Sequence, residues 1–302
     1  MDILVTGGTG FIGNHLCRQL LRHGHKVTCI DNNFTGSVNN IKDCFEFNFF
    51  DYIEHDVINI FDTNKNFDQI YHLACPASPI SYQADPINTL KTNFIGTLNI
   101  LELAKKKGAR FLLTSTSEIY GDPEVSPQPE DYRGNVNTIG PRSCYDEGKR
   151  VAETLTTEYK NMYCLETRIA RIFNTYGPKM NEYDGRVISN FIRQCSNNEE
   201  ITVYGNGEQT RSFCYVSDTV DGLIRLMNSN IDTPVNIGNP NEITINKLAA
   251  IIKNLTRCQS KIIYKPIPID DPKRRNPDIT KAIKYLNWQP SISLEEGIKQ
   301  ML

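Results

Sequence analysis

The chain has 302 residues, of which 39% are hydrophobic and 23% are charged, and its formal net charge is −2. A chain of this length and composition can bury the core of one or two globular domains. The nearly neutral charge argues against a nucleic-acid-binding protein, which usually carries a clear basic excess. No run of about 18 apolar residues is present, so no membrane span is expected. The strand-like run that starts at Ile3 leaves no room for a signal peptide, and we therefore expect a cytoplasmic protein.

The nine cysteines are scattered, with no Cys-x-x-Cys pair and no nearby histidines that would complete a zinc site. We therefore expect structural thiols in a reducing compartment and no metal. Cys144 stands apart because it adjoins a residue that we expect to be catalytic.

Short apolar runs alternate with longer periodic stretches in the first half of the chain. Strand-like runs occupy residues 2–6, 26–31, 52–55, 69–74 and 110–115. Apolar residues at helical spacing mark 10–22 and 85–107, and a later helix and strand are expected at 145–160 and 167–172. Strands that alternate with helices predict an α/β fold, a doubly wound (Rossmann) parallel sheet covered on both faces.

The character of the chain changes after Asn174, where turn signals become dense and the helical stretches shorten. We expect a smaller C-terminal substrate lobe that closes over the ligand edge of the sheet. A strand at 234–237 is expected to return to the first domain, so the two domains interleave. The expected NAD-binding domain is 1–173 plus about 211–237, and the sugar-nucleotide-binding lobe is about 174–210 and 238–302.

A glycine-rich turn follows the first expected strand and opens the first expected helix. Gly7, Gly10 and Gly13 give it the spacing G-x-x-G-x-x-G. Glycine permits a tight turn and close approach of the backbone to a pyrophosphate, which the helix N-terminus then faces. Asp31 ends the second strand, where a carboxylate would accept both hydroxyls of a ribose. The combination predicts a dinucleotide site rather than a purely structural turn.

The end of the second strand also selects the dinucleotide. The Asp31 carboxylate would repel the additional phosphate of NADP, and Asn32 and Asn33 supply no arginine to offset that repulsion. We therefore predict NAD. Asp56 and Val57 follow the third strand and are candidates for the adenine contact, although a surface position would explain Asp56 nearly as well. The other expected cofactor contacts are Phe11, Ile12, Phe34, Thr35, Gly36, Leu73, Cys75 and Thr92, together with Tyr145 and Lys149 of the helix at 145–160.

A catalytic pair is expected at the start of the helix at 145–160. Tyr145 and Lys149 are four residues apart, so they lie on one helix face. Tyrosine, with a pKa near ~10, is a poor base at neutral pH, but an adjacent ammonium group and a cationic nicotinamide would both favour its phenolate. Tyr-x-x-x-Lys alone is common. Here it follows the strand that ends at Thr116, where ligands of a doubly wound sheet bind, and the Thr116 hydroxyl could share a proton network with Tyr145.

The glycine turn, the strand-end threonine and Tyr-x-x-x-Lys together resemble the extended short-chain dehydrogenase/reductase family, and the resemblance spans essentially the whole chain. Sugar-nucleotide 4,6-dehydratases of that family carry Thr-Asp-Glu, in which the aspartate protonates the departing hydroxyl; this chain has Thr116-Ser117-Glu118. Epimerases generally lack the glutamate. The triplet therefore resembles the UDP-glucuronate decarboxylases. Further segments that resemble this group are 72–79, 121–125, 140–150, 171–178 and 271–275.

The resemblance implies a substrate and a set of residues that bind it. Arg275 would contact the carboxylate region of UDP-glucuronate, and a planar guanidinium suits a carboxylate because two parallel hydrogen bonds can form. The alternative for the basic segment around it is a solvated surface loop. The expected substrate contacts are Ser78, Lys91, Glu118, Asn174, Arg186, Tyr204, Gln209, Arg211 and Arg275, with Asn174, Arg186 and Arg211 as candidates for the diphosphate.

The resemblance also implies a reaction. Tyr145, assisted by Thr116 and Lys149, would remove the proton of the hydroxyl on carbon 4 while hydride passes to NAD. The ketone lies beta to the carboxylate, which is then lost as carbon dioxide. Glu118 and Ser117 would orient or relay protons, and reduction of the ketone would give UDP-xylose and regenerate NAD.

Several alternatives remain open. The protein could release the UDP-4-keto-pentose or form UDP-apiose. A 4,6-dehydratase is disfavoured by Ser117 and Arg275, and a catalytically silent NAD-binding scaffold has no need of Thr116, Tyr145 and Lys149. The helices at 85–107 and 145–160 commonly build a dimer interface in this family, so the resemblance implies a homodimer. No nucleic-acid or membrane partner is expected.

Overall fold

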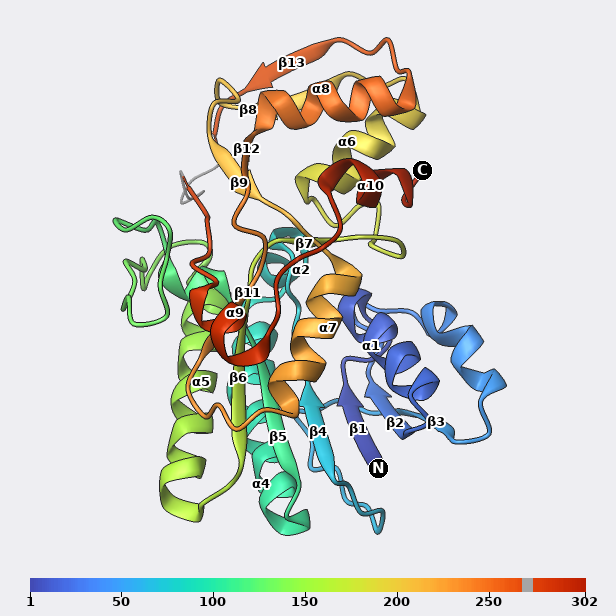
Figure 1. Ribbon diagram of the computed structural model, residues 1–302, viewed down its shortest axis with the longest axis vertical. Coiled ribbons are helices and arrows are strands. Elements are labelled where there is room, and N and C mark those ends of the chain that lie inside the picture. The colour runs from blue at the N-terminus through green and yellow to red at the C-terminus, as the bar shows by residue number, and fades with distance from the viewer. Residues whose placement is uncertain (268–273) are drawn as a thin grey trace.

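The computed structural model describes residues 1–267 and 274–302 and has a seven-stranded parallel sheet at its centre (Figure 1). The strand order is β11-β6-β5-β4-β1-β2-β3, and each neighbouring pair is parallel. The strands are β1 (Asp2–Thr6), β2 (Lys26–Asp31), β3 (Phe50–Glu54), β4 (Gln69–His72), β5 (Arg110–Thr116), β6 (Thr167–Ile172) and β11 (Val235–Ile237). This is the doubly wound arrangement that the sequence predicts.

Alternating side chains of the strands supply two separate cores, one on each face of the sheet. Ile3 and Val5 of β1 pack in one cluster with Leu16 of α1 (Phe11–Arg22). Leu4 lies between them in the chain and packs on the opposite face with Leu101 of α4 (Thr97–Lys107). Successive strand residues point to opposite faces, so a strand buried on both sides reads as an unbroken apolar run.

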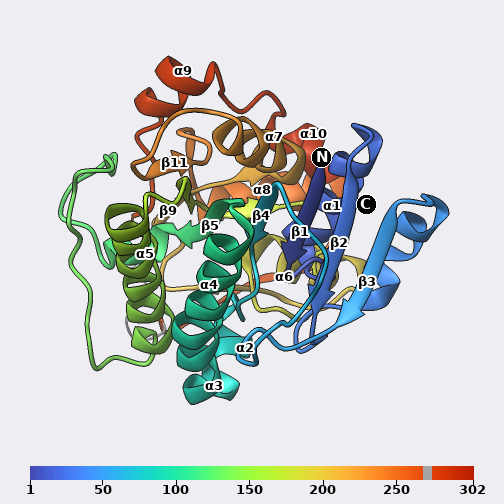
Figure 2. The same ribbon diagram turned by 90° about the horizontal axis from the view of Figure 1, so that it is seen from below.

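Helices cover both faces of the sheet. Figure 2 shows α4 and α5 (Ser143–Tyr163) on one side and α7 (Val216–Met227) on the other. The remaining helical segments are η1 (Val38–Glu46), α2 (Pro79–Ala84), α3 (Pro86–Lys91), η2 (Thr92–Gly96), η3 (Ser117–Tyr120), α6 (Val187–Ser196), α8 (Ile245–Thr256), α9 (Thr280–Leu286) and α10 (Leu294–Lys299). None of the helices within 1–267 and 274–302 combines the length and apolarity needed to cross a membrane.

Most of the expected elements form, with small differences that have physical causes. The third strand starts two residues earlier than expected because Phe50 pairs with Val27 of β2. The helix expected at 85–107 begins with α3, whose first turn is capped by the Asp85 carboxylate on the Asn88 amide at 2.9 Å. It then contains a π-helical turn, η2, before α4. The strand expected at 234–237 forms as β11 and returns to the main sheet beside β6.

Smaller elements gather at the carboxyl ends of the sheet strands. They form three two-stranded sheets: β7 (Thr175–Tyr176) with β10 (Cys214–Tyr215), β8 (Ile201–Tyr204) with β13 (Ile262–Lys265), and β9 (Thr210–Ser212) with β12 (Glu242–Thr244). Figure 1 shows β8, β13, α6 and α8 grouped beyond the ends of the main strands. These elements come from the chain segments on either side of α7 and β11, so the chain leaves the sheet, returns to it and leaves again.

Candidate active site

A cavity of about 1540 Å³ lies where the main sheet faces the smaller elements. Its wall runs from the glycine turn after β1, past the ends of β2, β4 and β5, to β8 and Arg275. The wall contains every residue that we predicted from the sequence to bind cofactor or substrate or to take part in catalysis, except Asn33 and Lys91. Asn33 instead donates to the Tyr52 hydroxyl at 2.6 Å, and Lys91 is exposed on α3. The structure thus brings together residues that are up to 268 positions apart, from Gly7 to Arg275.

Gly7 and Gly13 of the glycine turn stand where a side chain has no room. Gly7 has φ +73°, and a Cβ there would lie 2.7 Å from the Ala74 nitrogen. A Cβ on Gly13 would lie 2.1 Å from the Gly7 carbonyl oxygen, so the first turn of α1 packs directly on the loop. Gly10 is the N-cap of α1 and offers no side-chain cap. The first amides of α1 are therefore available to an anion, as a pyrophosphate site requires.

Asp31 provides the second half of a dinucleotide site. Its side chain is 7% exposed, and its two oxygens accept hydrogen bonds from the Thr9 amide at 3.0 Å and the Asn33 amide at 2.8 Å. A carboxylate has about four acceptor positions, so this one can still take two ribose hydroxyls. Asn32 lies beside it and donates to Asp56 at 2.9 Å. These residues fit NAD, and the carboxylate disfavours the additional phosphate of NADP.

The expected catalytic pair sits at the start of α5, buried in the wall of the cavity. Tyr145 is 6% exposed and stacks on Tyr82 of α2, with ring centroids 5.1 Å apart and an interplanar angle of 7°. Lys149 is 4% exposed, and its ammonium group donates to the Thr114 carbonyl at 2.9 Å. Both side chains face the strand end that carries Thr116, as expected from the four-residue spacing.

The pKa of Tyr145 in the structure is governed by its burial. Burial raises the pKa of the Tyr145 phenol well above its ordinary value, and the nearby Cys75 raises it further. The Thr116 hydroxyl and Arg186 oppose this rise. Desolvation of the phenol dominates its pKa in this structure, and the expected joint effect of Lys149 and the nicotinamide cation stays a prediction.

An arginine–carboxylate cluster forms the far end of the cavity. Glu118, in η3, accepts hydrogen bonds from Arg142 at 2.6 Å and from Arg275 at 3.1 Å. Arg275 is 2% exposed and also donates to the Ser117 hydroxyl at 3.0 Å and to the Gly121 carbonyl at 3.3 Å. Burial works to raise the pKa of Glu118, but the two guanidinium groups outweigh it and hold the pKa at about 2. Arg275 is thus a buried part of the site and not a residue of a solvated loop; residues 271–273 of the same motif lie outside the described residues.

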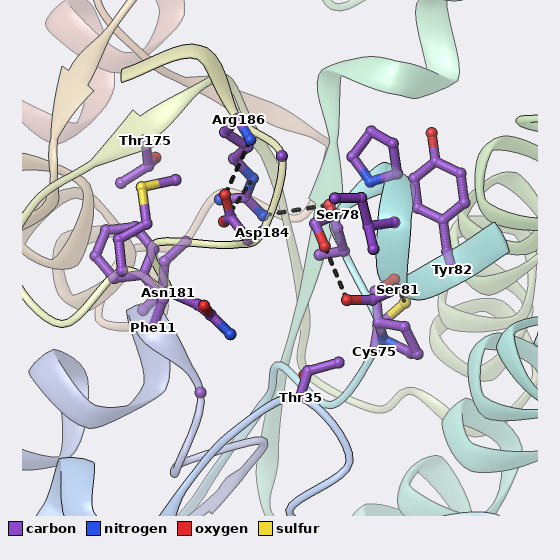
Figure 3. Close-up of a pocket in the computed structure, with 18 of the residues that line it drawn as sticks. Phe11, Thr35, Cys75, Ser78, Ser81, Tyr82, Thr175, Asn181, Asp184 and Arg186 are labelled. Atoms are coloured by element: carbon purple, nitrogen blue, oxygen red, sulfur yellow. Dashed lines mark hydrogen bonds and ion pairs between the residues drawn. The ribbon is translucent and has the colours of Figure 1, made fainter. Parts of the chain in front are cut away.

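The other substrate candidates line the same cavity. Arg186 lies 3.5 Å from the Asp184 carboxylate and donates to the Ala77 carbonyl at 3.2 Å, next to Ser78 (Figure 3). Ser78 and Ser81 share a hydrogen bond of 2.9 Å. Asn174, Tyr204, Gln209 and Arg211 complete this group.

Some residues of the site were not assigned from the sequence. Tyr82 is 1% exposed and supports Tyr145, but no local motif marks it. Arg142 and Asp146 lie inside the segment 140–150 that resembles the family, and that resemblance was the available signal. Cys144 is buried, and its sulfur lies 3.6 Å from the Tyr82 carbonyl, which fits a structural thiol. No cluster of three or more His, Cys, Asp or Glu residues that could hold a metal occurs in the described part of the chain.

Comparisons with known proteins agree with this geometry. Residues 3–238 match the model of the NAD dependent epimerase/dehydratase family. The chain is 56% identical over 300 residues to UDP-glucuronic acid decarboxylase 1 of Danio rerio, covering 99% of this chain and 71% of that protein. This chain belongs to the UDP-glucuronic acid decarboxylases of that family. It is also 56% identical to UDP-glucuronic acid decarboxylase 5 of Arabidopsis thaliana, covering 100% of this chain and 88% of that protein.

Solved structures place the family's ligands in the same fold. A UDP-glucose 4-epimerase of Thermotoga maritima with UDP-glucose has a TM-score of 0.91 and 31% identity, covering 100% of this chain and 97% of that one. A UDP-glucuronic acid 4-epimerase of Bacillus cereus, in complex with UDP-glucuronic acid and NAD, has a TM-score of 0.89 and 27% identity, covering 99% of this chain and 97% of that one. The cofactor of the family is NAD, in agreement with the Asp31 argument.

Proposed function

We propose that this protein converts UDP-glucuronate into UDP-xylose and carbon dioxide, with NAD recycled in each turnover. The observation that carries the proposal is the buried contact of Arg275 with Ser117 and Glu118, which follow Thr116 in the chain, in the cavity that Tyr145 also lines. A guanidinium there would hold the acid group of a uronic acid whose carbon 4 faces the phenol. A serine in place of the dehydratase aspartate removes the proton donor that loss of a hydroxyl needs.

The residues of the chain then divide the chemistry among them. NAD, when bound, supplies the hydride acceptor and donor at carbon 4 and a positive charge beside the Tyr145 phenol. Tyr145 takes the proton of the hydroxyl on carbon 4, with the Thr116 hydroxyl at its side, and returns it at the end. The intermediate ketone lies beta to the carboxylate, so breaking that carbon–carbon bond leaves an enolate. Arg275 holds the carboxylate in place until that bond breaks.

Incubation of the purified protein with UDP-glucuronate tests this function. We expect UDP-xylose and carbon dioxide in equal amounts, with no net consumption of added NAD. A 4-keto pentose that accumulates with stoichiometric NADH, or UDP-apiose as the product, would replace the proposed final step. Absence of carbon dioxide release combined with consumption of UDP-glucose or dTDP-glucose would refute the decarboxylase assignment and point to a 4,6-dehydratase.

The face formed by α3, η2 and α5 supports the further proposal of a homodimer. Ile87 and Phe94 are 61% and 44% exposed there, and Met162 is 69% exposed near the end of α5. Exposed apolar side chains of this size suit an interface between subunits. Sedimentation analysis should give twice the mass of the 34.3 kDa chain, and Phe94→Glu should shift it to the monomer mass.

The proposal also covers the cellular compartment and the movement of the two lobes. All nine cysteines are free, and seven of them are buried, which supports a reducing compartment such as the cytosol. The chain is divided into a larger lobe, 1–173 with about 211–237, and a smaller lobe, about 174–210 and 238–302. We propose that the smaller lobe closes on the substrate. Limited proteolysis with and without UDP should show protection of the smaller lobe.

A further inference from the structure

A second cavity, of about 240 Å³, adjoins the arginine–carboxylate cluster. Most of its lining is polar: Glu118, Gly121, Asp122, Asn135, Val136, Asn137, Arg142 and Asp146. Glu118 and Arg142 line both this cavity and the main one, so they form the wall between the two. A polar space of this volume has room for several water molecules, since each takes ~30 Å³.

Asp146 lines the second cavity but not the main one. Asp146 is 6% exposed, and its Oδ1 atom is buried without a hydrogen-bond partner. A buried polar atom that stays unpaired is costly. The N-cap of α5 is Arg142, so Asp146 lies past the position from which a side chain caps the first amides, and its unpaired oxygen points to another role.

The proposed function, on which this inference rests, needs a proton from outside. When the carboxylate leaves as carbon dioxide, the bond to carbon 5 breaks and its electron pair forms an enolate, which must gain one proton at carbon 5. Tyr145 cannot supply it, because the proton that Tyr145 takes from the hydroxyl on carbon 4 is returned to that oxygen at the end. One solvent proton is therefore consumed in every turnover.

The two acids at this end of the site differ in how they hold a proton. Arg275 and Arg142 keep the pKa of Glu118 at about 2, so Glu118 is ionised at neutral pH. Burial first, and then the Glu118 charge, raise the pKa of Asp146 to about 8, against the opposing pull of Arg142 and Arg275. The other titratable groups that influence this corner are Glu147, Tyr82 and Cys144. Asp146 therefore carries the proton that Glu118 lacks.

We propose that the second cavity and Asp146 form the entry route of the proton that ends on carbon 5. The proton leaves the Asp146 carboxyl, crosses by way of the Glu118 carboxylate in the shared wall, and bonds to carbon 5 of the enolate. Asp146 takes a replacement proton from water in the second cavity, which balances the one consumed in the product. Asp146 does not touch the substrate and is a positioning residue for this step.

Turnover in deuterated water tests the route, because the hydrogen added to carbon 5 can be located in the product by NMR. Wild-type protein should place one deuterium in a single one of the two positions on carbon 5. Asp146→Asn should lower the rate of product formation by about 100-fold, as expected for a lost proton-transfer group. It should also scatter the deuterium over both positions, because bulk water then protonates the enolate from either side.

Further variants separate the route from simple damage. Glu147→Gln changes a half-buried carboxylate on the same helical turn and should behave as wild type. Asp146→Glu should restore single-position labelling. Val136→Phe keeps Asp146 but fills the second cavity, and it should slow the protonation as Asp146→Asn does.

The outcomes distinguish this inference from the proposed function. If wild-type protein makes no UDP-xylose, the function itself fails. If it makes UDP-xylose, but Asp146→Asn and Val136→Phe both place the deuterium in one position at the wild-type rate, only the entry route is overturned.

Discussion

The two ends of the main cavity are built in different ways. The cofactor end is made of backbone: three glycines, the amides at the start of α1 and one strand-end carboxylate. The acid end is made of charged side chains from three distant segments, namely Glu118 after β5, Arg142 before α5 and Arg275 near the C-terminus. At the cofactor end, the shape of the site depends on positions where any side chain larger than that of glycine would clash with the backbone. At the acid end, each group is held by the charge of another.

This difference decides what a substitution can do. At the cofactor end, an added methyl group changes the space but no charge, so the effect should fall on NAD affinity. At the acid end, removal of one charge leaves its partners buried and incompletely paired, which costs more than the contact itself contributed. The predictions below test this division, from the largest expected effect to the smallest.

Tyr145 lines the cavity between these groups of residues as the proposed proton carrier, and loss of its hydroxyl should disable both the oxidation and the reduction of carbon 4. Tyr145→Phe keeps the ring stacked on Tyr82 but removes the proton carrier, so kcat should fall on the order of a thousandfold or more. Circular dichroism and NAD binding should be unchanged. Tyr163→Phe, on the exposed end of the same helix, is the matched control and should retain full activity. Near-normal turnover by Tyr145→Phe would contradict the assignment.

Arg275 tests the acid end alone. Arg275→Met removes the guanidinium from Glu118 and Ser117, and we expect kcat/KM for UDP-glucuronate to fall by about 100-fold, as for loss of one partner of a buried charge pair. NAD affinity should stay within about twofold, since a site at the other end is untouched. Arg274→Met removes an exposed guanidinium paired with Glu242 and serves as the control. If Arg275→Met and Arg274→Met changed kcat/KM equally, the special role of the buried guanidinium at the acid end would be contradicted.

Gly13 and Gly10 test the cofactor end with a graded pair. A Cβ on Gly13 meets the Gly7 carbonyl at 2.1 Å, whereas a Cβ on Gly10 meets the same atom at 3.2 Å. Overpacking of this kind costs about 1–3 kcal/mol, so Gly13→Ala should weaken NAD binding about tenfold or more and Gly10→Ala should weaken it less. Titration calorimetry with NAD and with UDP measures both. UDP affinity that falls as much as NAD affinity would show a general loss of structure.

Asp146 and Glu118, which both line the second cavity, should respond to pH in opposite ways. The pKa of Asp146 is raised to about 8 in the folded protein, while an unfolded aspartate has a pKa of about 3.9. The folded state therefore binds more protons between these values, and the unfolding free energy of the wild type should fall with rising pH in that window. Asp146→Asn removes this dependence, so its stability relative to the wild type should increase from pH 5 to pH 8 in urea titrations. A constant difference would contradict the protonated state of Asp146.

Glu118 supplies the opposite case. Its pKa of about 2 lies below the value of ~4.3 for an unfolded glutamate, so its stabilising contribution is present above that value and is lost as pH falls toward 2. The advantage of the wild type over Glu118→Gln should therefore shrink below pH 4. Its persistence at pH 3 would show that the guanidinium groups do not hold the carboxylate ionised.

The sequence predicts the two ends with unequal success, for a physical reason. Local spacing determines the glycine turn, the strand ending at Asp31 and the Tyr145–Lys149 face, and the structure places all of them on one cavity. The contact between Arg275 and Glu118 joins positions 157 residues apart, and spacing carries no information about it. Only the resemblance to a family pointed to Arg275.

Like contacts between distant residues, the burial of a side chain cannot be read from the sequence. The expected influence of Lys149 on Tyr145 follows from helix geometry alone, whereas the high pKa of the phenol follows from how much of it is desolvated. Tyr82 and Asp146 were missed for the same reason, because only the packed fold shows that one supports Tyr145 and that the other has an unpaired buried oxygen.

The central claim is that one site oxidises carbon 4, releases the acid group and then reduces the same carbon. UDP-glucuronate deuterated at carbon 4 tests it most directly, in a reaction with excess unlabelled NAD. The account predicts UDP-xylose that carries the deuterium on carbon 4, with one carbon dioxide released per product molecule. Unlabelled UDP-xylose, or label found in the added NAD pool, would contradict it.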